Sequence, residues 1–356
     1  MPIFIYPLVR EKIFLYKKMN ITLQHKNKDN YMNTEEKNKR TVVITNHESS
    51  TMHDTGQYHP EIDGRIQLAF DTLKKAMLPN IDFIKAIKAN IEHVLLCHSK
   101  EYMQFLQKAC EKANADSIHL YKNDTDMKIS KKTEEIANLA VGAVIQAIDF
   151  VINKKYQNSF CLIRPPGHHA IKDKGMGFCF YNNVAVGARY VLDKYAKSIK
   201  KVLIVDWDIH HGNGTQSFFL NDKNVYYFSV HLQNTYPHNP KESSIDSDTI
   251  KNNKISSALT GREEVLEAFN QLSKKMDKFR PDFIFISCGF DGHAEEKIVG
   301  GGLGLVEDDY IELTKIVKKI GSKYSQNRIV SVLEGGYNLE SLARSVEAHV
   351  STLAKK

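Results

Sequence analysis

Six short, nearly continuous apolar runs recur along the chain, and longer amphipathic stretches separate them. Such runs are typical of strands that are buried on both faces of a sheet. The six runs are 41–45, 160–163, 202–205, 225–230, 283–287 and 329–333. The stretches between them repeat apolar residues every three or four positions, which predicts helices. The clearest of these helices are 133–152, 263–279, 308–324 and 339–353. Strands that alternate with helices predict an α/β chain with one parallel sheet and helices on both faces.

Composition excludes several classes of protein. Of the 356 residues, 42% are hydrophobic and 26% charged, which is typical of a globular chain. The net charge of +7 comes from lysines spread along the chain, so we expect a solvated basic surface and no nucleic-acid site. The longest apolar runs that we identify fall short of the roughly 18 residues of a membrane span, so no membrane association is expected.

Cysteine usage and the N-terminal stretch bear on the location of the protein. The five cysteines form no CxxC pair, which favours a reducing compartment. The short apolar stretch at the N-terminus meets charged residues at once and does not resemble a secretory signal, so the cytoplasm or nucleus is the expected location. Residues 1–40 are rich in Lys, Asn and Glu and predict a poorly ordered extension before a compact domain over 41–356.

Five of the apolar runs end in segments that carry His, Asp, Gly and Tyr. The carboxyl ends of parallel strands meet at one edge of a sheet, which is where such sheets bind ligands. These segments are 164–169, 206–214, 229–231, 288–293 and 334–337. Chance would scatter the 15 histidines along the chain, so their gathering predicts an active site at this edge.

The residue types at this edge fit a metal site. Asp208 and His210 are two positions apart, so both side chains point the same way in an extended chain, and Asp291 follows another strand. Two carboxylates and one imidazole, without a thiolate nearby, predict an open zinc site with room for water and substrate. The alternative is a strand end whose polar side chains only cap the backbone.

Two further motifs are interpreted as functional because a metal site is predicted beside them. His168 and His169 alone would be interpreted as a buried, hydrogen-bonded pair, but next to a metal they are expected to transfer protons. Tyr337 follows two glycines, which give the backbone freedom to bring its side chain to the site. The alternative for Tyr337 is a packed ring at a strand end.

The chain resembles the zinc-dependent histone deacetylases, and it is most similar to their class II branch and to bacterial histone deacetylase-like amidohydrolases. The resemblance covers roughly residues 41–353, and HPEIDGR (59–65) and CHSKEYM (97–103) match in order and spacing. The longer motifs are RPPGHHA (164–170), GFCFYNNVAVGA (177–188), VDWDIHHGNGTQ (205–216), YFSVH (227–231), CGFDGH (288–293) and LEGGYNL (333–339).

The resemblance implies an arginase/deacetylase fold, in which a single domain holds a parallel eight-stranded sheet between helices. It implies Zn²⁺ bound by Asp208, His210 and Asp291, proton transfer by His168 and His169, and an oxyanion held by Tyr337. The resemblance also implies that His168 pairs with the carboxylate of Asp206 and that His169 pairs with the amide of Asn213. Because a carboxylate partner favours imidazolium, we expect His169 to act as base and His168 mainly as a cation, with His168 also a candidate acid.

The resemblance also implies a substrate channel and a second cation. The channel residues are Gly177 at the floor, Phe178 and Tyr236 as walls, and Asp126, with Asp124 as an alternative, as a rim carboxylate. Potassium is the second cation, and its site maps onto Asp206, Asp208, His210, Ser229 and Val230.

The implied reaction is hydrolysis of N-acetyl or N-acyl lysine in a protein or peptide, with histones among the candidate partners. An acetylpolyamine amidohydrolase and a catalytically weak acyl-lysine-binding protein are the alternatives. Two loops depart from the family pattern. The Tyr-Pro-Gly-Thr-Gly motif reads Tyr236-Pro-His-Asn-Pro240 before a polar stretch to 253, and Asp-Pro-Leu-Gly is replaced by 296–300. Ile298 or Val299 stands where polyamine enzymes carry a glutamate, which favours protein substrates, although Glu295 and Glu296 are near.

Overall fold

The structure is a computed structural model that describes residues 39–113, 119–121, 124–298 and 300–355. The predicted extension over 1–40 lies outside the described residues up to position 38 and remains a prediction. The strands are β1 (Thr41–Thr45), β2 (Ile81–Lys85), β3 (His119–Tyr121), β4 (Asp124–Ile129), β5 (Asn158–Leu162), β6 (Val202–Asp206), β7 (Val225–Leu232), β8 (Ile250–Ile255), β9 (Phe283–Cys288) and β10 (Ile329–Leu333).

The helices of the described chain connect these strands. They are α3 (His47–Ser50), α4 (Gly64–Lys75), α5 (Ile91–Val94), α6 (Lys100–Lys112), α7 (Thr133–Ile152), α8 (Asn183–Lys194), α9 (Asn213–Phe219), the 3₁₀ turn η1 (Glu242–Ser244), α10 (Arg262–Phe279), α11 (Glu307–Tyr324) and α12 (Leu339–Ala354). All four helices expected from the sequence are confirmed within one residue at each end, because each has an uninterrupted apolar face.

Eight strands form one parallel sheet, in the order β2-β1-β5-β10-β9-β6-β7-β8. The predicted α/β fold with an eight-stranded parallel sheet between helices is confirmed. The two edge strands of this sheet were not predicted from the sequence: β2 reads IDFIK and β8 reads IKNNKI. An edge strand is partly exposed, so it lacks the continuous apolar run of a central strand. The polar stretch up to 253 therefore ends inside β8 rather than in a loop.

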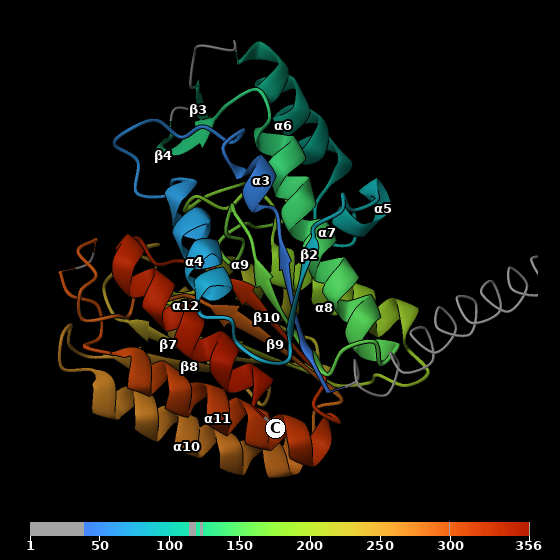
Figure 1. The fold of residues 1–356 in the computed structure, drawn as a ribbon, viewed down its shortest axis with the longest axis vertical. Coiled ribbons are helices and arrows are strands. Elements are labelled where there is room, and N and C mark those ends of the chain that lie inside the picture. The colour runs from blue at the N-terminus through green and yellow to red at the C-terminus, as the bar shows by residue number, and fades with distance from the viewer. Residues whose placement is uncertain (1–38, 114–118, 122–123, 299, 356) are drawn as a thin grey trace, which may run out of the picture.

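Two hydrophobic cores hold helices against the two faces of the sheet. Along each strand alternate side chains enter opposite cores, as Val42 and Val43 of β1 do. One core is formed with α5–α9, and the other with α4, α10, α11 and α12. Figure 1 shows α10, α11 and α12 side by side over one face, with α7 and α8 on the opposite side. The sheet is thereby covered on both faces.

By length and composition alone, helix α7 could cross a membrane. The search for long apolar runs in the sequence did not identify it. In the fold it is a core helix: Ile136, Ala140 and Val144 pack in the hydrophobic core. Its apolar character therefore has a structural explanation.

The five strands that carry the His, Asp and Tyr segments are neighbours in the sheet. They form its continuous centre, β5-β10-β9-β6-β7. Because these strands are parallel, their carboxyl ends and following loops converge on one edge. The pairing of Asp206 in β6 with Ser287 in β9 brings the loops that contain Asp208 and Asp291 together.

Candidate active site

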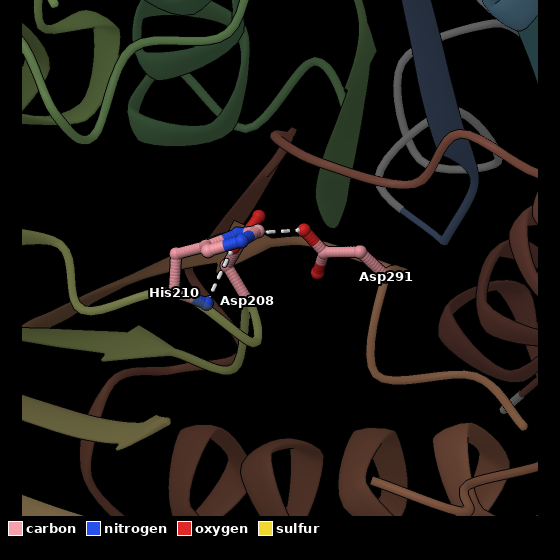
Figure 2. Close-up of side chains that lie close together, drawn as sticks. All are labelled: Asp208, His210 and Asp291. Atoms are coloured by element: carbon pink, nitrogen blue, oxygen red, sulfur yellow. Dashed lines mark hydrogen bonds and ion pairs between the residues drawn. The ribbon is translucent and has the colours of Figure 1, made fainter. Parts of the chain in front are cut away.

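Asp208, His210 and Asp291 form a compact cluster with ligand atoms within 4.8 Å of one another. Nδ1 of His210 lies 3.1 Å from Oδ1 of Asp208 and 3.1 Å from Oδ2 of Asp291. Figure 2 shows His210 close to both aspartates, which come from separate loops. Asp208 and His210 follow β6, whereas Asp291 follows β9.

The electrostatics of this cluster fit a cation. All three side chains are buried. Burial and the nearby Asp208 carboxylate raise the pKa of Asp291 to about 6. Burial alone would lower the pKa of His210, but hydrogen bonds to Asp208 and Asp291 outweigh it and raise that pKa to about 9. A proton on His210 compensates the two carboxylates, and a divalent cation would take the place of this proton.

Two glycines leave space for the carboxylates. A Cβ at Gly335 would lie 2.2 Å from Oδ2 of Asp291, and one at Gly289 would lie 2.2 Å from Oδ2 of Asp208. The backbone N–H of Gly335 also donates to Oδ2 of Asp208 at 2.8 Å. Any side chain at either position would therefore displace a carboxylate of the cluster.

The tandem histidines His168 and His169 lie beside this cluster, and each forms a hydrogen bond with a different partner. Nδ1 of His168 lies 3.2 Å from Oδ2 of Asp206, and its Nε2 lies 3.7 Å from Oδ1 of Asp208. Burial lowers the pKa of His168, but Asp208 and Asp206 together outweigh it and raise that pKa to about 10. These carboxylates therefore favour the imidazolium form of His168 at neutral pH.

His169, in contrast to His168, is neutral. Its Nδ1 lies 2.8 Å from the amide oxygen of Asn213, so the Nδ1–H donates and Nε2 keeps a lone pair. Burial and the charges on His168 and His210 lower the pKa of His169 well below 6.5. His169 is therefore a neutral base, 4.0 Å from His168 between ring centroids.

Tyr337 lines the same cavity as His169 and His210. Its ring meets Phe178 edge-on at 5.6 Å between centroids, and the Arg65 guanidinium lies 4.9 Å from its centroid. Burial raises the pKa of Tyr337 well above 10, so its hydroxyl stays a neutral donor.

A cavity of about 390 Å³ connects these groups with the surface. Gly177, Phe178 and Tyr236 line it together with His169, His210 and Tyr337. Gly177 has φ +54, and a Cβ there would lie 2.5 Å from Cδ2 of His169 and 2.7 Å from Cε1 of Tyr236. Only glycine fits this floor position, between a wall and the base.

The rim of the cavity contains Asp126 and Ile298, which were expected there, and also His238. Asp126 and Ile298 line the cavity, whereas Val299 lies outside the described residues. His59 Nε2–H donates to the backbone oxygen of Asp126 at 3.0 Å. His238, which stands where the family pattern has glycine, has φ 58 and so keeps a left-handed conformation that favours glycine.

The two glutamates of the departing loop do not face the cavity. Glu295 pairs with Arg344 at 2.7 Å on the surface. Glu296 is buried, and its carboxylate accepts from backbone N–H groups. Neither glutamate is among the side chains that line the cavity.

The residues expected to bind potassium are buried at the end of β6, in the loop after it and within β7. Asp206 and Ser229 are register partners, and Val230 follows Ser229. Among the described residues, only Asp208, His210 and Asp291 group as a cluster of metal-ligating side chains. Potassium, which the resemblance places mostly on oxygens, remains a prediction.

Sequence analysis assigned no role to Glu334, although it lies inside a quoted motif. Its Oε2 accepts from the backbone N–H groups of Gly167 and His168, at 2.6 and 3.1 Å. Burial raises the pKa of Glu334 to about 7. A glutamate directly after a fully buried strand was the available signal.

A buried ion network under the site was also missed. Glu61 accepts from Arg65 at 3.0 Å and from Arg164 at 2.6 Å, and all three side chains are fully buried. Arg65 also donates to the backbone oxygen of Gly336 at 2.6 Å. The motif HPEIDGR contains Glu61 and Arg65, but their partners are distant in sequence and could not be identified from it.

Comparison with known proteins gives consistent similarities. Residues 59–353 match the family described as "Histone deacetylase domain". A probable deacetylase of Archaeoglobus fulgidus is 32% identical over 304 residues, covering 83% of this chain and 81% of that protein. Histone deacetylase clr3 of Schizosaccharomyces pombe is 34% identical over 83% of this chain.

Some relatives are much longer than this chain. The chain spans 45% of the Schizosaccharomyces pombe protein. It spans 21% of the type-2 histone deacetylase 2 of Dictyostelium discoideum, to which it is 31% identical over 360 residues. Among solved structures, the crystal structure of the HDA15 HD domain superposes with a TM-score of 0.78 at 29% identity, over 88% of this chain and 90% of that one.

Proposed function

Because the chain belongs to the histone deacetylase family, we propose that it hydrolyses the amide of acetylated lysine in proteins or peptides, with a bound zinc ion. The observation that carries this proposal is the convergence of three groups on one cavity. His210 of the cluster of two carboxylates and an imidazole, the neutral His169 and Tyr337 all line the same cavity. The deacetylase domain is proposed to cover residues 41–356, after the extension.

Asp208, His210 and Asp291 would hold the divalent ion. Two oxygen ligands and one nitrogen ligand in an open arrangement suit Zn²⁺. When bound, such an ion supplies Lewis-acid chemistry, because it polarises the acyl carbonyl and lowers the pKa of water.

The histidine pair supplies the proton transfers. Nε2 of His169 carries the free lone pair and accepts a proton from water, and the hydroxide so formed adds to the carbonyl carbon. A protonated histidine of the pair then gives its proton to the leaving lysine nitrogen as the C–N bond breaks, which releases acetate and the amine. His168 remains cationic beside Asp206 and stabilises the negative charge that develops.

Tyr337 donates from its hydroxyl to the acyl oxygen once that oxygen becomes anionic. Its intact hydroxyl supports an enzyme over a protein that only binds acyl-lysine. Burial of the site strengthens this interaction, because a low dielectric screens the developing charge poorly.

A protein or peptide substrate is favoured over a free polyamine. The rim presents Ile298, whose side chain is 40% exposed, and Glu296 is turned inward. The additional cationic nitrogens of an acetylpolyamine would find no carboxylate from this loop at the cavity. The names of several relatives include "histone deacetylase", which supports histones as candidate substrates.

A substrate screen with purified protein tests this function. Acetyl-lysine peptides, longer acyl-lysine peptides and acetylspermidine would be incubated at equal concentration, and acetate or acyl release measured. We expect the acetyl-lysine peptides to be cleaved with the highest kcat/KM. Faster cleavage of acetylspermidine than of every peptide would favour the polyamine alternative, and binding without cleavage would favour the acyl-lysine-binding one.

A further inference from the structure

We propose that Glu296 is a positioning residue for Tyr337, and that it links the mouth of the channel to the group that holds the oxyanion. This inference rests on the proposed function of Tyr337. Glu296 lies in the long connection between β9 and α11, where side chains are usually solvated. Its own exposure is nevertheless 3%.

Both carboxylate oxygens of Glu296 accept from backbone N–H groups. Oε2 accepts from Tyr337 at 2.7 Å and from Asn338 at 3.0 Å. Oε1 accepts from Lys297 at 2.8 Å and from Ile298 at 3.2 Å. Hydrogen bonds from N–H groups to an ionised oxygen are roughly twice as strong as neutral ones. One buried carboxylate therefore joins two loops that are 41 residues apart in sequence.

The Tyr337 backbone depends on such a contact. It lies between the end of β10 at Leu333 and the start of α12 at Leu339, so no sheet or helix bond holds its N–H. The preceding Gly336 has φ +118, a conformation that only glycine adopts readily. Glu296 therefore holds the segment through the N–H of Tyr337, and Arg65 holds it through the oxygen of Gly336.

The same carboxylate also positions the mouth. The carboxylate accepts a hydrogen bond from the backbone N–H of Ile298, and Ile298 lines the cavity together with Tyr337. A second contact runs parallel to it, because the Asn338 side chain donates to the backbone oxygen of Glu295 at 3.0 Å. A substrate that packs against Ile298 therefore acts on the loop that holds Tyr337.

Two other roles for Glu296 fit the geometry less well. Capture of a cationic substrate would need an oxygen facing the cavity, but both oxygens are engaged by the backbone. A merely structural role would affect folding stability and leave Tyr337 function intact once the protein has folded.

The test is Glu296→Gln, with the neighbouring Glu295→Gln as matched control. Glutamine has nearly the same size but only one acceptor oxygen, and its NH₂ would face backbone donors. We expect kcat on an acetyl-lysine peptide to fall on the order of 10- to 100-fold, with KM changed less than about 2-fold, since misplacement by about 1 Å has effects of this size. Glu295→Gln should leave kcat near the wild-type value. Hydrogen exchange of the segment 334–340 should become faster in Glu296→Gln alone.

A double-mutant cycle separates positioning from general damage. In the Tyr337→Phe background, Glu296→Gln should lower kcat by less than about 2-fold, because the hydroxyl that it positions is already absent. An equal loss in both backgrounds would overturn the proposal, as would unchanged exchange of 334–340. Glu296→Asp, which keeps the charge but shortens the reach, gives the same readouts if the glutamine variant does not fold. If wild type cleaves no acylated amine, or Tyr337→Phe is fully active, the proposed function fails instead.

Discussion

Nδ1 of His169 donates to the neutral amide oxygen of Asn213 at 2.8 Å, which leaves the lone pair of this base on Nε2. The adjacent His168 faces a carboxylate and carries a proton. Two adjacent residues of the same type therefore differ in protonation state: carboxylates favour the proton on His168, whereas burial and the charges on His168 and His210 disfavour one on His169.

The first prediction concerns pH. The pKa of His169 lies well below 6.5, so the base stays neutral, and kcat/KM should hold as pH falls through 6.5. In Asn213→Asp, a carboxylate would favour imidazolium and raise that pKa, so the acid limb of the pH–kcat/KM profile should move to higher pH. Profiles of both proteins over pH 4–9 check this, and coincident acid limbs would argue against His169 as the base.

The second prediction concerns the metal. Asp208→Asn replaces a charged oxygen of the cluster by a neutral amide, which weakens binding of a divalent cation. We expect elemental analysis to find about one zinc per wild-type chain and much less in the variant, with activity lost in parallel. Full wild-type activity after exhaustive chelation would contradict the proposed site.

The third prediction concerns Tyr337. Removing one oxyanion donor typically lowers turnover by about 10²–10³-fold. Tyr337→Phe keeps the ring that packs on Phe178, so the fold should survive and kcat should fall by this order with KM little changed. Steady-state kinetics on an acetyl-lysine peptide measure it. Wild-type kcat would mean that Tyr337 is only a packed ring.

The fourth prediction concerns substrate choice. Ile298→Glu places a carboxylate at the cavity rim, where it can pair with the additional nitrogens of a polyamine. We expect the ratio of kcat/KM for acetylspermidine to that for an acetyl-lysine peptide to rise on the order of 10-fold. Ile298→Gln is the uncharged control. A ratio that rises equally in both variants would show that charge is not the cause.

The fifth prediction concerns stability. Burial raises the pKa of Glu61, but Arg164 and Arg65 outweigh it and lower that pKa from 4.5 to about 2. This stabilisation is fully present above pH 4.5 and is lost as pH falls toward 2. Glu61→Gln should therefore lower the free energy of unfolding at pH 7 by about 3 kcal/mol, because two buried guanidinium groups lose their charged partner.

Urea denaturation at pH 7 and near pH 3 tests this sign. The difference between wild type and Glu61→Gln should shrink at the lower pH. Glu48→Gln, which removes an exposed pair with Lys85, should change stability little at either pH. A difference that is independent of pH would refute the charge explanation.

Local patterns in the sequence were enough to predict the six inner strands and four main helices. Burial on both faces gives a strand a continuous apolar run, and one buried face gives a helix a repeat of three and four. The edge strands β2 and β8 were missed because partial exposure breaks that run. The position of the site followed from the polar segments after five strands, since parallel strands end at one edge.

The sequence by itself determined the fold class and which side chains reach this edge, because both depend on periodicity and strand direction. Beyond the histidine partners that the family resemblance implied, only the tertiary structure decided which distant residues surround each group. Three contacts join positions that are far apart in the chain. Glu296 accepts from the backbone of Tyr337, Glu61 pairs with Arg164, and Gly335 leaves space for the carboxylates of Asp208 and Asp291. Such contacts set hydrogen-bond partners, burial and charge, and no local pattern encodes which distant residue will supply them.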